Sequence, residues 1–511
     1  MIRNNQSKKA LIFLGFFFFL GFITILGISW ANYNTFNYPN DYAIVIDAGS
    51  SGSRTYVYSW KSGLSAYKGD NIRVEELSEC TKNPGIDKLN SKNDVILYFY
   101  DCLQKSSKLI PNDRKDRAYI ILAATAGMRL LDITNRNQSE KILSLIREHF
   151  SESEFLFKSK DQVKIIDGKD EGLYGWISAN YFAEKFSKKS DPETTIGTLD
   201  LGGASTQIAF LPSVQRENSS VTNQFFEKLR IYGSDYRTYS SSFLCWGTNQ
   251  IILVYQTYLI IKNGYKPQIN ASCFNLQKTI EISVSSILNS PCANGDIFKY
   301  SPNIDLTKLK EQSVYVFNGN SDPDKCEEEL QVLFPNKTCS YGKCTFNDIY
   351  LPSISSKNKF YAFSSYYYQM ANSEQLSNKI LRKNFPEYVS ETKKLCSLDY
   401  NELTEINNKL KVPISEEYLQ TICFYNLYIS KLLPKFQINN FDNVEIGNKI
   451  NGYTIGWTLG YMIDLINRED FLPQETPKRN LDKGIFVPVI IICVLFALVA
   501  FISGLSSFIY L

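Results

Sequence analysis

The chain of 511 residues contains a single histidine, His149, and no pair of cysteines in a Cys-x-x-Cys arrangement. These absences argue against a Ser-His-Asp triad, against metal sites with histidine ligands and against zinc ribbons. His149 lies in the charged run Arg147-Glu148-His149, where we expect a surface position on a helix. A hydrolase built from this chain must therefore use carboxylates, hydroxyl groups and a hard cation with oxygen ligands.

The chain also lacks the basic field that nucleic acid would require. Its formal net charge is +3, and because Arg3, Lys8 and Lys9 precede the first apolar segment, the remaining residues sum to zero. Nucleic acid is accordingly not expected as a partner. The hydrophobic content of 44% is enough for a large core or for two lobes.

Two long apolar segments without charge lie near the ends of the chain, at Ala10–Trp30 and Gly484–Leu511. Each exceeds the roughly 20 residues that cross a bilayer, so we expect transmembrane helices at 10–30 and 484–511. The alternative for the first segment is a cleaved signal peptide, although signal peptides have apolar runs of only about 7–15 residues. The basic residues before it place residues 1–9 in the cytoplasm and residues 31–483 outside the cell or in a lumen. We therefore expect a two-pass membrane protein that contacts membrane lipid and has the means to form homo-oligomers through its transmembrane helices.

The cysteines agree with an oxidising compartment. Ten of the eleven lie between the apolar segments, and Cys493 lies inside the second. Glycosylation sequons begin at Asn137, Asn218, Asn270 and Asn336. Both features support an extracellular or lumenal location, at the cell surface or in the Golgi and endosomes.

Two turns about 150 residues apart share one pattern. One apolar strand ends at Asp47 and runs into a Gly/Ser turn, and a second ends at Asp200 before a similar turn. Glycine lets backbone N–H groups approach a phosphate, hydroxyl groups add donors, and an Asp at a strand end holds a hydrated divalent cation. One such turn would be weak evidence because Asp-x-Gly turns are common in hairpins. Two of them predict a duplicated nucleotide-binding fold that clamps phosphates between two lobes.

Strands alternate with helical segments around these turns, which favours an α/β architecture. We expect hairpins at both turns, strands at 118–124 and 163–166, and helices that begin near 125 and 171. The first lobe is expected at about 40–175 plus about 441–475, and the second at about 176–440. The polar segment 468–483 is expected to be a juxtamembrane stalk.

Five motifs follow one another along the chain: Asp47–Arg54, Ala124–Leu131, Asp170–Tyr181, Asp200–Gln207 and Gly456–Met462. In this order they resemble the apyrase conserved regions of the ecto-nucleoside triphosphate diphosphohydrolases. The two anchors and ten cysteines resemble the cell-surface branch, whereas the Ser-Gly-Ser-Arg of the first turn is more similar to Golgi and yeast members. The resemblance implies two RNase H-like lobes of the actin–hexokinase superfamily, flanked by transmembrane helices.

The resemblance also implies roles for individual residues. Asp47 and Asp200 would hold Ca²⁺ or Mg²⁺ through water, and Trp457 would pack beneath the metal. Glu171 would be the general base, with Ser205 and Gln207 orienting the attacking water. The phosphate-binding residues would be Ser50, Ser51, Gly52, Ser53, Thr125, Gly202, Gly203 and Ala204.

Several of these roles have simpler alternatives. Asp170 competes with Glu171 on sequence alone, and an acid there also suits a helix N-terminus. Thr125 could cap a helix, and Trp457 between glycines is often a core residue.

The base pocket is the least defined part of the site. The matching aromatic residue is Tyr367, with a buried β-rich segment as the alternative for the run 366–368. Several cell-surface members carry a second Tyr where this chain has Ile422, and a basic residue where it has Thr248. Tyr418 or Tyr425 could take the place of the missing second Tyr. The disulfides implied by spacing and family pattern are Cys80–Cys102, Cys245–Cys292, Cys273–Cys326, Cys339–Cys344 and Cys396–Cys423.

We therefore expect an anchored apyrase that hydrolyses nucleoside tri- and diphosphates to monophosphates by direct, metal-assisted attack of water. Phosphoanhydride hydrolysis needs charge neutralisation, an in-line water and an acceptor for its proton. The alternatives are a Golgi nucleoside diphosphatase acting on GDP or UDP in support of glycosylation, a sugar kinase or chaperone of the same fold, and a nucleotide-binding receptor without turnover.

Overall fold

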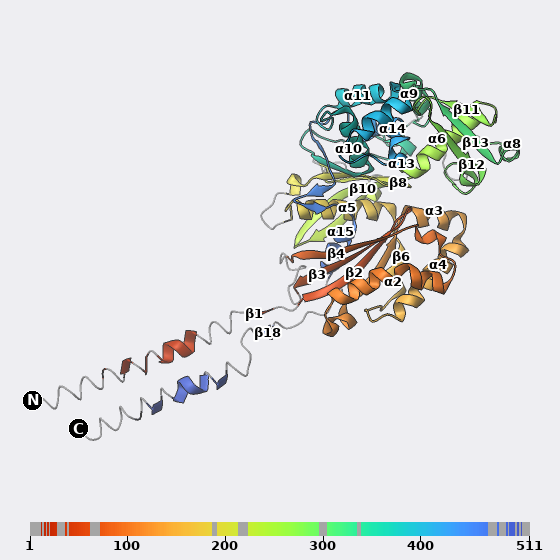
Figure 1. Cartoon of the computed structure of the whole chain (residues 1–511). Helices are drawn as coiled ribbons and strands as arrows, with labels where there is room; N and C mark the ends of the chain where they lie inside the picture. The colour runs from red at the N-terminus through yellow and green to blue at the C-terminus, as the bar shows by residue number, and fades with distance from the viewer. Residues whose placement is uncertain are drawn as a thin grey trace, which may run out of the picture. The chain divides into compact units, whose positions relative to one another are not determined.

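The computed structural model divides the chain into two compact units (Figure 1). Unit 1 comprises 1–41, 60–65 and 473–511, and unit 2 comprises 42–59 and 66–472. The structure describes residues 12, 15–16, 18–19, 21–27, 36–37, 40–61, 72–186, 192–212, 223–295, 304–334, 339–468, 478–479, 487–488, 490–495, 498–499 and 502.

Unit 1 contains the two terminal segments. The short strands β1 (Phe36–Asn37) and β18 (Lys478–Arg479) pair in antiparallel fashion, which joins the two ends of the chain. The expected transmembrane helices at 10–30 and 484–511 lie only partly within the described residues, and those described there are helical. Among the described residues, none forms a helix with the length and apolar character needed to cross a membrane.

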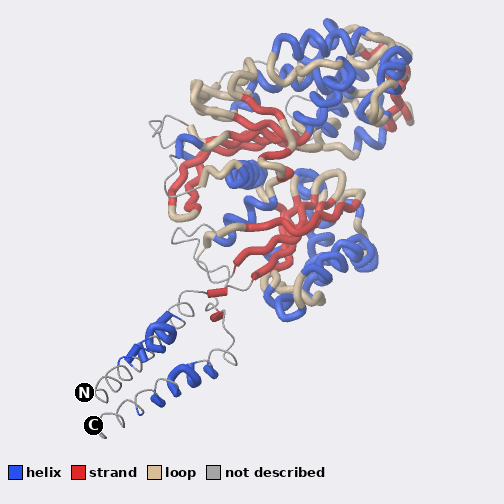
Figure 2. The backbone as a smooth tube through the Cα atoms, turned by 60° about the vertical axis from the view of Figure 1, so that its left-hand side comes forward, coloured by secondary structure: helices blue, strands red, loops and turns tan. Residues whose placement is uncertain are grey.

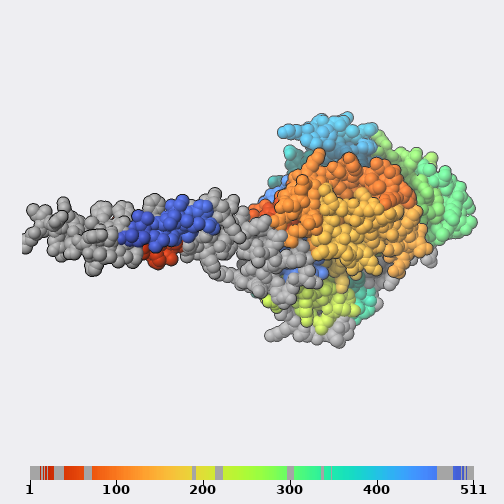
Figure 3. Space-filling model, turned by 90° about the horizontal axis from the view of Figure 1, so that it is seen from below, coloured from red at the N-terminus to blue at the C-terminus, as the bar shows by residue number. Residues whose placement is uncertain are grey.

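The first sheet of unit 2 has the strand order β4-β3-β2-β5-β6. β2 and β5 are parallel, with Asp47 opposite Ala123, and every residue of β5 is buried, as its unbroken apolar sequence requires. The strands are β2 (Asn40–Ala48), β3 (Ser53–Lys61), β4 (Val74–Lys82), β5 (Tyr119–Ala124) and β6 (Val163–Ile165). The helices of this lobe are α2 (Lys92–Leu109), α3 (Ala126–Thr134) and α4 (Arg136–Ser151). In the space-filling view of Figure 3, this lobe forms the orange face.

The second sheet has the order β15-β14-β7-β8-β10-β9. Its strands are β7 (Gly197–Leu201), β8 (Ser205–Phe210), β9 (Phe226–Ile231), β10 (Ser234–Leu244), β14 (Phe360–Ser364) and β15 (Val444–Ile446). If β9 is set aside, the strands of each sheet, counted in chain order within their lobe, lie in the same spatial order, 3-2-1-4-5. The two lobes therefore repeat one topology, as the two similar turns predict. β15 extends the second sheet slightly beyond the expected lobe boundary near residue 440.

Helices cover the second sheet on the side away from the first lobe, as Figure 2 shows. The additional helices are α6 (Thr248–Lys262), α7 (Val284–Leu288), α8 (Leu306–Leu309), α9 (Pro323–Gln331), α10 (Ser365–Ser377), α11 (Phe385–Ser397), α12 (Tyr400–Asn408), α13 (Glu416–Leu419) and α14 (Ile422–Lys435). The additional strands are β11 (Gln268–Ala271), β12 (Thr279–Ser283), β13 (Val314–Gly319), β16 (Lys449–Ile450) and β17 (Tyr453–Thr454). The run 366–368 lies at the start of α10, so the alternative of a β-rich segment is wrong.

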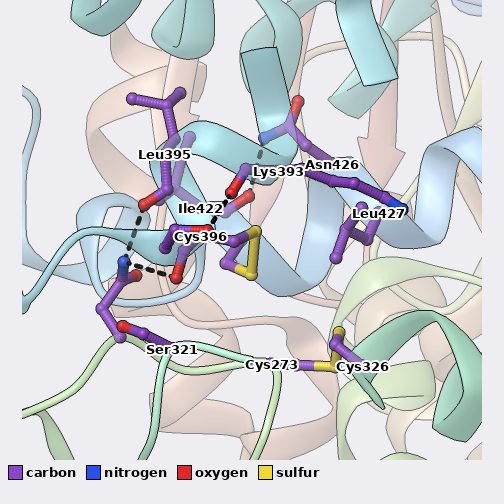
Figure 4. Close-up of a disulfide and its surroundings, with 12 residues drawn as sticks. Cys273, Ser321, Cys326, Lys393, Leu395, Cys396, Ile422, Asn426 and Leu427 are labelled. Atoms are coloured by element: carbon purple, nitrogen blue, oxygen red, sulfur yellow. Dashed lines mark hydrogen bonds between the residues drawn. A yellow bond between two sulfur atoms is a disulfide. The ribbon is translucent and has the colours of Figure 1, made fainter. Parts of the chain in front are cut away.

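Five disulfides join the pairs that the family pattern implies, and Cys493 is free. Cys80–Cys102 links β4 to α2 in the first lobe, and the other four lie in the second. Figure 4 shows Cys396, whose disulfide joins α11 to α14, near the Cys273–Cys326 bridge. The buried Asn275 amide donates to the carbonyl oxygens of Leu395 and Leu398, which ties the loop after β11 to the end of α11.

Other expectations can be placed on the fold. His149 is half-buried on α4 beside Phe150. Asn137 and Asn270 are exposed, whereas Asn218 and Asn336 lie outside the described residues. Glycosylation stays a prediction.

Two helices connect the sheets. α5 (Gly168–Phe182) follows the last strand of the first sheet and packs on β7, β8 and β10 of the second. α15 (Thr458–Ile466) follows the second sheet and packs on α5 and on β4, and the Thr458 and Tyr58 hydroxyl groups are 2.8 Å apart. The Gly460 N–H donates to the Ser178 hydroxyl at 2.7 Å, and a Cβ on Gly460 would lie 1.9 Å from the Tyr174 carbonyl oxygen. Glycine is thus required where the two helices cross.

This crossing yields a stability prediction with a control in the same motif. Gly460→Ala should lower the free energy of unfolding by about 1–3 kcal/mol because the added methyl group forces α5 and α15 apart. Gly456→Ala should change it little, since a Cβ at Gly456 has nothing within 4 Å. Thermal unfolding of both variants checks this, and equal midpoints would contradict the packing described.

Candidate active site

The two turns have the same hydrogen bond. The Gly49 N–H donates to the Gly52 carbonyl oxygen at 2.9 Å, and the Gly202 N–H donates to the Ser205 carbonyl oxygen at 3.0 Å. In each turn the donor lies two residues after the aspartate near the end of the preceding strand, which is Asp47 in the first turn and Asp200 in the second. The likeness of the two sequences therefore extends to their backbone geometry.

The first turn lies against the second lobe and against α3. A Cβ added to Gly203 would lie 2.6 Å from the Ser50 hydroxyl oxygen, and one added to Gly127 would lie 2.7 Å from the Ser50 Cα. The approach at Gly127 requires glycine because it is to backbone, whereas at Gly203 the Ser50 hydroxyl could rotate away. Ser50 therefore sits between the second turn and the start of α3.

The expected phosphate ligands differ in exposure. Ser51 is exposed, whereas Ser53 is 2% exposed and accepts a hydrogen bond from the Tyr98 hydroxyl at 3.0 Å. The Ser53 side chain is thus held inside the first lobe. Thr125 is the N-cap residue of α3, but its side chain makes no capping hydrogen bond, and its N–H donates to the Ala48 carbonyl oxygen. The structure therefore gives no support to helix capping as the role of its hydroxyl group.

Asp47 and Asp200 are largely, though not fully, buried, and each has one carboxylate oxygen shielded from solvent. Within the described part of the chain, one carboxylate oxygen of each has no hydrogen-bond partner. Burial raises the pKa of Asp47 to about 7, against the opposing charge of Arg54. Burial likewise raises the pKa of Asp200 to about 7, and the Glu171 charge adds to this. Buried anions that repel one another and present free oxygens suit a hard divalent cation.

Neighbouring side chains partly compensate these charges. Arg54 lies 3.5 Å from the Asp47 carboxylate, and a hydrogen bond from the Trp457 side chain lowers the pKa of the same group. Trp457 is 4% exposed, which fits a residue packed beneath the carboxylate. A hydrogen bond from Ser364 lowers the pKa of Asp200. Ser364 joins β14 to α10 with a φ of 56°, a strained conformation for a residue other than glycine.

The Glu171 carboxylate lies at the centre of a hydrogen-bonded cluster. It accepts from the Arg129 guanidinium at 2.7 Å and from the Gln207 amide at 3.2 Å. The Ser205 hydroxyl oxygen accepts from the same two groups, at 3.1 and 2.7 Å. The Gln207 amide also lies 3.1 Å from the Ser242 hydroxyl oxygen. The structure thus brings together the three residues expected to activate water.

Asp170, the alternative base, has different neighbours. Its pKa is raised by burial and by Asp167, and the charges that act on it belong to Lys169, Glu227 and Lys164. Neither Gln207 nor Ser205 donates to it among the described hydrogen bonds, whereas Gln207 donates to Glu171. The geometry therefore favours Glu171 as the base.

Three contributors were not assigned a role from sequence. Arg129 lies within the motif Ala124–Leu131, and this position was the only indication of a role in the sequence. Its partners, Glu171 and Ser205, come from distant segments. Ser242 lies on β10, and Ser364 is the last residue of β14. No sequence pattern marks either serine, since each acts through contacts that only the sheet creates.

The expected base-stacking residue, Tyr367, is half-buried. The Arg382 guanidinium lies 5.5 Å from the centre of its ring, and the Tyr368 ring packs on it edge-on at 5.3 Å. Tyr368 itself is 47% exposed. Arg382 therefore covers part of Tyr367, while Tyr368 presents the more accessible ring.

The suggested substitutes for a second aromatic residue differ. Tyr425 packs against the large core, and its hydroxyl donates to the Thr248 carbonyl oxygen at 3.3 Å, so it is engaged. Tyr418 is 43% exposed, and the charges of Tyr368 and Arg54 act on it. Ile422 is buried. Of the two, Tyr418 is the one with a ring accessible to a ligand.

The sequence of the chain matches the model of the GDA1/CD39 (nucleoside phosphatase) family over residues 34–483. The chain belongs to this family. It is 31% identical to ectonucleoside triphosphate diphosphohydrolase 1 of Mus musculus over 529 residues, covering 100% of this chain and 96% of that protein. It is also 31% identical to ectonucleoside triphosphate diphosphohydrolase 3 of Homo sapiens, over 87% of this chain and 82% of that protein.

The fold agrees with membership of the GDA1/CD39 family. A crystal structure of nucleoside triphosphate hydrolases from Neospora caninum superposes with a TM-score of 0.59 at 12% identity, covering 84% of this chain and 93% of that one. This likeness shows a mixed α/β, actin-like fold with two sheet-containing lobes. The expected fold class is thereby confirmed for unit 2, whereas the flanking spans are not tested by it.

The buried carboxylates predict a measurable effect of charge removal. Asp200→Asn should raise the stability of the metal-free protein in EDTA at pH 8, because the folded state no longer buries that charge. The difference between a pKa of about 7 and the ordinary 3.8 corresponds to at most about 4 kcal/mol. The penalty in the parent accumulates as the pH rises from about 4 to about 7, so the gain should vanish near pH 4. Thermal unfolding across this range is the measurement, and a less stable variant at pH 8 would contradict the account.

Proposed function

We propose that this protein hydrolyses nucleoside tri- and diphosphates to monophosphates and inorganic phosphate. The main support for the proposal is the Glu171 cluster. In it, the Gln207 amide donates hydrogen bonds both to the Glu171 carboxylate, which is placed to activate water, and to the Ser205 hydroxyl. The family and the relatives named above support this activity, and the expected enzyme class agrees with them. A binding protein without turnover would have no use for this arrangement.

The reaction proceeds by direct attack of water on the terminal phosphate. Backbone N–H groups of the two turns hold the phosphates, with Ser50, Ser51, Gly52, Gly202, Gly203 and Ala204 as the ligands. Ser205 and Gln207 orient the water, and Glu171 takes its proton as the new P–O bond forms. Thr125 contacts the terminal phosphate. The Ser53 hydroxyl is engaged by Tyr98, so Ser53 contributes through its backbone N–H.

Asp47 and Asp200 would hold a divalent cation through water, and Trp457, which hydrogen-bonds to Asp47, would pack beneath the site. When bound, the cation supplies positive charge that neutralises the phosphate oxygens. The unpartnered oxygen on each aspartate and the raised pKa values support this placement. Both Ca²⁺ and Mg²⁺ meet these requirements, since binding through water needs no tight protein cage.

The nucleotide base stacks on the tyrosines at the start of α10. Tyr367 remains the proposed stacking residue, and the exposed rings of Tyr368 and Tyr418 extend the same surface. None of these residues discriminates strongly between purines and pyrimidines by a buried hydrogen bond, so we expect broad base tolerance.

The apolar segments 10–30 and 484–511 anchor both ends of the chain in a membrane, in contact with lipid, and the catalytic unit faces the cell exterior or a lumen. The antiparallel pairing of β1 with β18 supports anchors that lie side by side, and homo-oligomers would form through these helices. The five disulfides support an oxidising compartment. Protease treatment of intact cells tests the topology, because cleavage should spare residues 1–9.

The base is tested by a matched pair of variants. Glu171→Gln keeps the shape of the side chain but cannot accept a proton, so turnover should fall by roughly 10²–10⁴-fold with nucleotide affinity nearly unchanged. Asp170→Asn should have a much smaller effect. Phosphate release from ATP and ADP measures both. Near-normal turnover by Glu171→Gln together with an inactive Asp170→Asn would transfer the role to Asp170.

Metal removal is the second test. We expect no phosphate release from ATP, ADP, UDP or GDP in EDTA, and recovery with either Ca²⁺ or Mg²⁺ because both accept oxygen ligands. The same panel separates the proposed activity from a Golgi diphosphatase, which would cleave UDP and GDP but ATP poorly. Undiminished turnover in chelator would refute the cation site.

A further inference from the structure

A cavity of about 270 Å³ lies next to the Glu171 cluster, and we call it the Arg129 cavity. Its walls include Arg129, Lys169, Ser241, Ser242, Leu244 and Ile349. None of its described lining residues belongs to the two phosphate-binding turns, and neither Asp47 nor Asp200 lines it. The cavity is therefore separate from the surface on which the two turns converge.

Two side chains belong both to the cavity and to the reaction centre. Arg129 donates to Glu171 and Ser205 and also lines the cavity. The Ser242 hydroxyl oxygen lies 3.1 Å from the Gln207 amide and also faces the cavity. Arg129 and Ser242 therefore link the reaction centre to the cavity.

Two cations, Arg129 and Lys169, and one acidic residue, Asp167, line the cavity. Arg129 is paired with Glu171 at 2.7 Å, and Lys169 is paired with Glu227 at 2.7 Å. A route for phosphate must bind the anion weakly enough to release it. Cations that are already paired with carboxylates meet that condition. Leu244 and Ile349 add an apolar wall that offers an anion no lasting contact.

Hydrolysis changes the charge next to Arg129 at the step that forms phosphate. Water adds its oxygen to the terminal phosphorus, the bond to the leaving diphosphate or monophosphate breaks, and the proton passes to Glu171. Arg129 then faces a neutral carboxyl group and a newly formed phosphate anion. Its guanidinium, freed from an anionic partner, is placed to receive that phosphate.

We propose that the Arg129 cavity is the exit through which inorganic phosphate leaves, with Arg129 as the group that transfers it from the reaction centre. This rests on the proposed function, since it concerns the product of the same site. The nucleotide product would leave separately, from the side of the two turns. Release of the two products is thereby uncoupled.

The test uses the full-length chain with two cavity variants, each with a matched control. Ile349→Trp fills the cavity, and its control is Ile380→Trp at a residue 67% exposed elsewhere in the second lobe. Lys169→Glu makes the cavity wall anionic, and its control is Lys228→Glu, the same charge change at an exposed residue of β9 outside the cavity. None of these residues contacts Glu171, Ser205 or Gln207 in the described hydrogen bonds.

Each protein is mixed rapidly with ATP and Mg²⁺. Acid quenching measures total phosphate formed, and a fluorescent phosphate-binding protein measures free phosphate. In both cavity variants, bond cleavage should keep its rate, while free phosphate should lag and its release should slow roughly tenfold. The controls should match the parent.

The outcomes are distinct. Free phosphate that follows cleavage without lag in Lys169→Glu or in a folded Ile349→Trp would overturn the exit. Absence of phosphate after acid quenching of the parent would instead overturn the proposed hydrolase function. Lys169 is partly exposed, so its replacement keeps the test decisive if the larger tryptophan prevents folding.

Discussion

Three carboxylates, Asp47, Asp200 and Glu171, lie close enough for their charges to act on one another in a largely buried region. Such an arrangement is unfavourable without compensation, because each anion loses hydration and repels the others. The surrounding structure supplies that compensation unevenly. Arg129 pairs with Glu171, whereas Asp47 and Asp200 each retain an oxygen that has no partner among the described residues. The protein thus pairs its base with an arginine, whereas its two aspartates offer free oxygens to a cation.

The duplicated topology explains how two of these carboxylates meet. In each lobe the aspartate lies on the central strand of the 3-2-1-4-5 order, and the turn after it closes with the same hydrogen bond. The helices that follow the last strand of each lobe, α5 and α15, cross at Gly460 and hold the two turns against each other. Glu171 comes from the first turns of α5, so the helix that connects the lobes also carries the base.

Much of this site could be predicted from sequence because its signals are local. The turns at Asp47 and Asp200 depend on short runs of glycine and serine whose conformations are set by neighbouring residues. The disulfide pairs and the choice of Glu171 over Asp170 depended on resemblance to a family. Arg129, Ser242 and Ser364 could not be assigned, because their partners are 35 or more residues away and no period in the sequence connects them. The run 366–368 was ambiguous since tyrosines suit strands and buried helices alike.

The most direct test of the account is a structure of the catalytic unit in the full chain with a non-hydrolysable ATP analogue and Mg²⁺. The account predicts the terminal phosphate between the two turns, the cation between Asp47 and Asp200, and a water bonded to Glu171, Ser205 and Gln207 in line with the scissile bond. A nucleotide bound elsewhere, or an in-line water nearer to Asp170 than to Glu171, would contradict it.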